Sequence, residues 1–113
     1  MTAYLISFPA EAMRVPEKDM PAVSEAAEAV SREAKEAGVL VFAGGLDGAV
    51  GPVVVDGDGT VTPGTHPQTE RLDGGFTVVD VPSRAEALVW AAKLAAACRC
   101  GQEVRVFGEG ALH

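Results

Sequence analysis

The sequence has few of the residues on which common binding and catalytic sites depend. Among its 113 residues are two cysteines, two histidines and nine lysines or arginines, against sixteen aspartates and glutamates. Two cysteines cannot support a disulfide-rich scaffold, and they favour a reducing compartment, so we expect a cytoplasmic protein. The net charge of −7 argues against nucleic-acid binding, because affinity for phosphates depends on clustered lysines and arginines.

Long hydrophobic runs are also missing. No stretch approaches the roughly 18 apolar residues of a membrane-spanning helix, and residues 1–9 lack the basic region and small-residue cleavage site of a secretory signal. We therefore expect no membrane association. The length predicts one domain over residues 1–113. The apolar content of 48% is enough for a core, although a second subunit would help a chain this short to bury more surface.

The spacing of apolar residues predicts two helices and six strands. Pro21 suits a first helical turn, Asp19 a cap before it, and Gly38 the end of that helix. Ser83 and Glu86 form a capping box that opens the second helix. The expected helices span residues 21–37 and 84–97, and the expected strands span residues 3–8, 39–46, 53–55, 60–62, 76–81 and 103–107.

This order predicts an α+β fold of the ferredoxin-like, split β-α-β kind, with both helices on one face of an antiparallel sheet. The strands at 53–55 and 60–62 flank two Asp-Gly pairs and form an inserted hairpin. Strands 39–46 and 76–81 carry apolar residues on both faces, although the helices can cover only one. We expect a homodimer with its sheets packed face to face, the dimeric α/β-barrel arrangement.

The chain resembles the YCII-related family, in particular its DGPF-type branch. The resemblance rests on 37–40 (Ala-Gly-Val-Leu), 44–46 (Gly-Gly-Leu), 74–76 (Gly-Gly-Phe), 86–91 (Glu-Ala-Leu-Val-Trp-Ala) and 103–106 (Glu-Val-Arg-Val). It implies a ferredoxin-like fold that dimerises through its sheets. Some relatives are small-molecule enzymes, including a dehydrochlorinase of chlorinated aromatic breakdown, and DGPF-type members are often encoded beside sigma factors.

Two departures from the family pattern bear on function. The tetrapeptide Asp-Gly-Pro-Phe falls on Pro63-Gly64-Thr65-His66, so its carboxylate is absent. Other family members pair a histidine near the first helix with an aspartate after the second strand. Asp47 matches the position of that aspartate, but residues 1–65 contain no histidine. The resemblance therefore does not carry this His–Asp pair over to the chain.

His66 is the candidate for acid–base chemistry, because an imidazole titrates near neutral pH. Asp47, Glu70 and Asp73 are carboxylates that could orient it if the loop over residues 63–74 folded against the sheet. The alternative is a loop histidine that is solvent-exposed or caps a turn.

Arg14, Glu70 and Arg71 are candidate ligand-binding residues. The guanidinium group of either arginine can hold an anion with two hydrogen bonds. The alternative for Arg14 is a surface ion pair with Glu11 or Glu17. We expect no metal site, because Asp56 and Asp58 begin a calcium-loop pattern that fails at its twelfth position, Pro67. Cys98 and Cys100 also lack the further ligands that zinc needs, and no cofactor-binding motif is present.

Three functions therefore remain open. The chain could be a non-catalytic dimer that binds a small molecule in a cleft between the sheet and the 63–74 loop. It could be a small-molecule enzyme of the lyase or dehydrochlorinase kind that uses His66. It could also be an accessory of a sigma-factor system that acts by protein contact.

Overall fold

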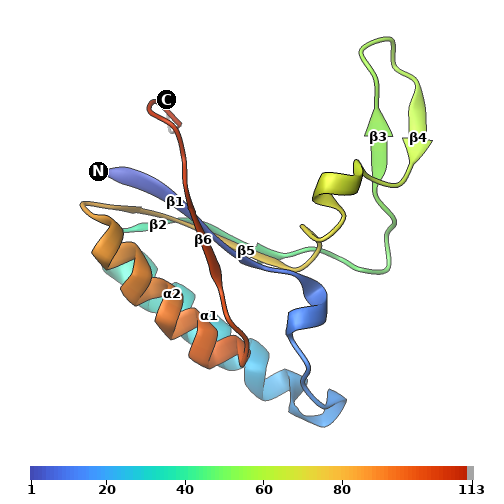
Figure 1. The fold of residues 1–113 in the computed structure, drawn as a ribbon. Helices are drawn as coiled ribbons and strands as arrows, with labels where there is room; N and C mark the ends of the chain where they lie inside the picture. Colours follow the sequence, from blue (N-terminus) through green and yellow to red (C-terminus); the bar gives the residue numbers. More distant parts are fainter. Residues whose placement is uncertain (112–113) are drawn as a thin grey trace.

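A four-stranded antiparallel sheet with two helices on one face forms the body of the protein (Figure 1). The computed structural model describes residues 1–111. The strand order is β2-β5-β1-β6, which confirms the ferredoxin-like split β-α-β topology. The strands are β1 (Thr2–Phe8), β2 (Leu40–Gly45), β5 (Gly75–Val81) and β6 (Glu103–Val106), and the helices are α1 (Met20–Glu36) and α2 (Arg84–Cys98).

The core lies between the helices and the sheet. Tyr4 and Ile6 of β1 face the helices, as their alternation predicts, and pair across the sheet with Val79 and Thr77 of β5. Ile6 and Val79 are fully buried. The helices meet them with small side chains, so the two layers approach closely. The buried members of this core are Tyr4, Ile6, Val79, Val81, Ala87, Ala91 and Leu94.

Within residues 1–111, no helix or strand covers the sheet face away from the helices (Figure 1). Leu5, Val78 and Arg105 lie side by side across the three strands on that face, and Phe42 pairs with Val78 from β2. Phe42 is 59% exposed, whereas Leu5 and Val78 are half-buried. We call this surface the open sheet face.

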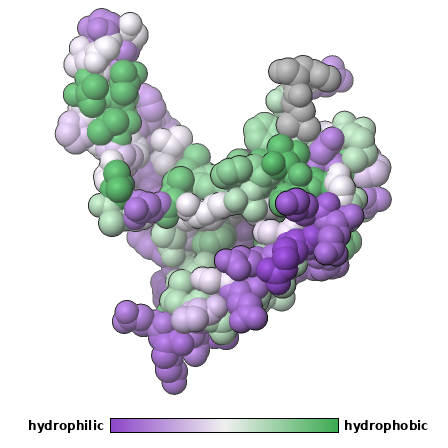
Figure 2. Space-filling view, turned by 180° about the vertical axis from the view of Figure 1, so that it is seen from behind, coloured by the Kyte–Doolittle hydropathy of each residue, from purple (hydrophilic) through white to green (hydrophobic). Residues whose placement is uncertain are grey.

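The inserted hairpin is a separate arm. Its strands β3 (Val53–Val55) and β4 (Val61–Pro63) pair only with each other within residues 1–111, in a two-stranded sheet of their own. Figure 2 shows the arm standing away from the body with apolar side chains gathered on it. The radius of gyration, 15.3 Å, exceeds the value of about 13 Å for a compact chain of this length, as a projecting arm requires.

The structure confirms the predicted helix caps with one exception. Ser83 Oγ accepts a hydrogen bond from the Glu86 amide at 3.3 Å, which confirms the capping box. Gly38 adopts a φ of +75°, and the Val39 amide reaches back to the Ala34 carbonyl at 3.0 Å to close α1. Asp19 precedes α1 as expected, but its side chain makes no cap hydrogen bond. It accepts a hydrogen bond from Arg99 at 3.1 Å instead.

Two further local features were not expected. A bulge between Leu40 and Phe42 breaks the alternation of β2, so the simple two-face division of that strand is wrong. Three short 3₁₀ turns, Ala10–Ala12, Glu17–Asp19 and Pro67–Thr69, occupy segments where the sequence has no clear period. No helix within residues 1–111 is long and apolar enough to cross a bilayer.

Candidate functional site

A cleft of about 410 Å³ lies between α1 and one end of the sheet. Its walls come from α1, from the ends of β2 and β5, from the connection between β1 and α1, and from the end of α2. Most of its lining residues are apolar: Phe8, Met13, Met20, Val23, Ala27, Ala43, Phe76, Leu94 and Cys98. A volume of this size and an apolar lining with a few polar groups are typical of small-molecule sites.

Glycines shape the sheet side of the cleft. Gly44 and Gly45 end β2, and Gly75 begins β5 opposite them. A Cβ atom on Gly75 would lie 2.5 Å from Cε1 of Phe8, so only a glycine lets the Phe8 ring lie across this position. The Phe8 residue thereby becomes part of the cleft lining, together with Gly44, Gly45 and Gly75.

The polar groups of the cleft come mainly from α1. Ser24, Glu28 and Ser31 lie three and four residues apart, which places them on one side of the helix. Thr77 of β5 and Gln102, just before β6, add a hydroxyl and an amide. Glu28 lines the cleft and is exposed there, and within residues 1–111 no ion pair joins it to Arg32, four residues further along the helix.

Cys98 contributes a thiol to the cleft wall. It is buried at the end of α2, and burial raises the pKa of its thiol, with the neighbouring Cys100 adding to the effect. Burial also raises the pKa of Cys100, which is half-buried. A raised pKa favours the neutral thiol over the thiolate, and the thiolate is the form that acts as a nucleophile. Within the described chain, no group of three or more His, Cys, Asp or Glu residues could hold a metal ion.

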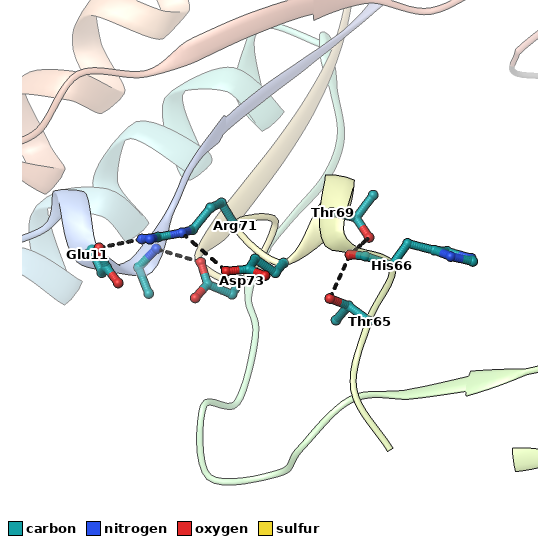
Figure 3. Close-up of polar contacts among 8 residues, drawn as sticks. Glu11, Thr65, His66, Thr69, Arg71 and Asp73 are labelled. Atoms are coloured by element: carbon teal, nitrogen blue, oxygen red, sulfur yellow. Dashed lines mark hydrogen bonds and ion pairs between the residues drawn. The ribbon is translucent and has the colours of Figure 1, made fainter. Parts of the chain in front are cut away.

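His66 lies away from this cleft. It is exposed and stands at the start of the turn Pro67–Thr69, where its carbonyl accepts hydrogen bonds from Thr65 Oγ1 at 2.8 Å and from the Thr69 amide at 3.1 Å. Figure 3 shows its ring extending away from Arg71 and Asp73. Within residues 1–111, the hydrogen bonds of His66 involve its backbone carbonyl, and no hydrogen bond or ion pair involves its imidazole ring.

The other loop candidates make local contacts of their own. Arg71 forms ion pairs with Glu11 and, at 3.9 Å, with Glu70 (Figure 3). The hydrogen bond and charge of Glu11 raise the pKa of Arg71. Arg14 is exposed, and Glu11, one of its two expected partners, pairs with Arg71 instead. None of these groups lines the cleft.

The two aspartates hold backbone turns. Asp47 Oδ1 accepts a hydrogen bond from the Ala49 amide at 2.9 Å and so stabilises a turn after β2. Asp73 Oδ1 accepts one from the Ala10 amide at 2.9 Å, tying the loop to the segment after β1 (Figure 3). The site residues expected from the sequence are therefore exposed loop residues, and Arg71 with Glu70 is the one pair among them that the described structure joins. The cleft is lined by none of them.

The topology and the cleft together define a ferredoxin-like α+β protein with a hollow between its first helix and its sheet. A sequence model of the YCII-related domain matches residues 4–107, so the chain belongs to the YCII-related domain family. The match does not distinguish the DGPF-type branch. No curated protein matches the chain.

A solved structure supports the fold. The chain is similar to 5-chloro-2-hydroxyhydroquinone dehydrochlorinase (TftG) from Burkholderia phenoliruptrix AC1100, solved in complex with 2,5-dihydroxybenzoquinone. The sequence identity is 13% and the TM-score 0.50, with 96% of this chain and 95% of the other covered. At this identity the similarity concerns the fold.

Proposed function

We propose that this chain binds a small, largely apolar molecule in the cleft beneath α1. The observation that carries the proposal is a hollow of about 410 Å³ with an apolar lining and a strip of polar groups on one helix. The similar dehydrochlorinase was solved with 2,5-dihydroxybenzoquinone, a single-ring molecule, so this fold is compatible with a ligand of that size. We propose this cleft beneath α1 as the binding site, in place of the cleft expected between the sheet and the 63–74 loop.

A pair of helix variants tests the proposal. Ala27 lines the cleft, whereas Ala29 on the same helix is exposed and does not. Ala27→Leu fills part of the hollow, and Ala29→Leu adds the same side chain outside it. We expect fragments that bind the wild type, detected by shifts of backbone amide resonances, to bind Ala27→Leu about tenfold more weakly and Ala29→Leu unchanged. Equal binding to both variants would place the ligand elsewhere.

The acid–base hypothesis for His66 and Asp47 lacks a geometric basis within one chain. His66 has an exposed, unoriented ring, and Asp47 holds a turn. We expect His66→Ala to leave fragment binding in the cleft unchanged. A loss of binding in that variant would return His66 to the site.

We also infer that the protein is a homodimer joined through the open sheet face, in a cytoplasmic setting that keeps Cys98 and Cys100 reduced. Phe42 is 59% exposed there, beside the half-buried Leu5 and Val78, and such contiguous apolar surfaces mark interfaces. Sedimentation should give about twice the 11.6 kDa chain mass for the wild type. Phe42→Glu should give the monomer mass, because it places a charge in the interface. A monomeric wild type at micromolar concentration would contradict the inference.

A further inference from the structure

The charged side chain among the residues that line the cleft is acidic. Glu28 is the one residue with a charged side chain among those that line it, and no lysine, arginine or histidine is among them. Within residues 1–111 no ion pair or side-chain hydrogen bond involves its carboxylate. A carboxylate accepts hydrogen bonds and can offer none while ionised. Glu28 is exposed, so water can satisfy it, and a molecule that lies beside it in the cleft gains most by offering a hydrogen-bond donor.

The polar groups next to Glu28 can also accept hydrogen bonds from a ligand. Ser24 lies one turn before it and Ser31 one turn after it on the same side of α1. Their hydroxyls can accept hydrogen bonds as well as donate them. The remaining walls, including Phe8 and Met20, are apolar and suit a ring or a short hydrocarbon chain.

The N-terminus of α1 also borders the cleft and has the opposite preference, since it carries a partial positive charge of about half a unit. That effect falls off within the first turn, and Pro21 removes one of the amide donors there. Glu28 brings a whole negative charge. The net charge of the chain, −7, adds a field of the same sign.

We propose that the occupant of the cleft is a compact apolar amine, positively charged at neutral pH. Its ammonium group lies against the Glu28 carboxylate, and its apolar part lies against Phe8 and the wall beyond it. The inference rests on the proposed function of the cleft and adds the chemical class of the ligand.

Three probes, each with a phenyl ring but with a different polar group, test this assignment: 2-phenylethylamine, 2-phenylethanol and phenylacetate. Their affinities are measured by titration of backbone amide resonances, which also locates each probe. Because Glu28 is exposed at the cleft, we expect the gain from its charge to be that of a surface ion pair. The amine should bind about threefold more tightly than the alcohol and about tenfold more tightly than the carboxylate. At 0.5 M salt the difference in affinity between the amine and the other two probes should shrink, because the Debye screening length at this concentration is only a few ångströms.

A matched pair of variants assigns the preference to Glu28. Glu28→Gln should give the amine and the alcohol equal affinities. Glu25→Gln, which changes an exposed glutamate that does not line the cleft, should keep the wild-type ratio. Probes that bind in the cleft without a preference for the amine, or a preference that survives in Glu28→Gln, would overturn the assignment of an amine and leave the site intact. If no probe shifts the cleft amides, the proposed function fails and the inference falls with it.

Discussion

Gly74 offers the most direct test of how the sheet is assembled at the edge of the cleft. A Cβ atom on this residue would lie 2.1 Å from the carbonyl oxygen of Phe8, 2.9 Å from the amide nitrogen of Ala10 and 3.0 Å from the carbonyl carbon of Pro9. All three are backbone atoms, so no side-chain rotation relieves the clash. Gly74→Ala therefore has to separate the end of β1 from the start of β5.

The cost follows from the contacts that such a separation disturbs. Overpacking a tight site costs about 1–3 kcal/mol. The displacement also strains the hydrogen bond from the Ala10 amide to Asp73 and the one from the Leu46 amide to the Gly74 carbonyl, both 2.9 Å long. We expect Gly74→Ala to lower the free energy of unfolding by about 3 kcal/mol. For a chain of this length that corresponds to a fall in Tm of about 12 °C.

The matched control is Gly45→Ala on the neighbouring strand. A Cβ atom there would meet nothing within 4 Å, so this variant should change stability by less than about 0.5 kcal/mol. Urea and thermal unfolding, followed by circular dichroism, measure both variants. If the free energies of unfolding of Gly74→Ala and Gly45→Ala differ by less than about 1 kcal/mol, then the close approach of β1 to Gly74 is not present in the folded protein.

Three further measurements address the caps and the thiols. Ser83→Ala removes the hydroxyl that caps α2 and should cost about 1 kcal/mol in urea unfolding, and an unchanged midpoint would contradict the cap. Iodoacetamide at pH 8 should modify the half-buried Cys100 faster than the buried Cys98, with equal rates only in urea. Because burial raises the pKa of both thiols, the folded chain keeps their protons to higher pH than the unfolded chain does. Stability should therefore fall as the pH rises from about 8.5 through the raised pKa values, and less steeply in Cys98→Ser. A wild-type profile that is flat in this range would refute the shift.

The regular elements could be predicted because their signals are local. Alternation of apolar residues gave the strands, and Gly38 and the Ser83–Glu86 box marked helix ends that the structure confirms within one or two residues. The topology followed from the order of these elements. The bulge in β2 has no local signature, because it depends on how the strand meets β5.

The candidate site could not be predicted from residue types. His66 and Arg71 were chosen because an imidazole and a guanidinium can do chemistry, but the loop that carries them lies outside the cleft. Glu28 is exposed and also lines the cleft, and helical periodicity does not mark a residue at the border between the two faces of a helix as part of a site. The neighbouring glycines 44, 45, 74 and 75 were recognised as a family feature. The close approach of Gly74 and Gly75 to Phe8 becomes visible only when β1 and β5 are placed side by side.

The place of β1 in the sheet has a consequence for the order of events during synthesis. This strand is synthesised before the other three strands of its sheet, yet it lies between β5 and β6, the last two of these four to be made. At about 5–20 residues per second, β1 waits several seconds for its first partner. Its apolar residues Tyr4 and Ile6 are without their sheet neighbours throughout that time. The sheet can therefore form around β1 only after β5 has been translated, and the pairing of distant segments, not the formation of the helices, should limit the rate of folding.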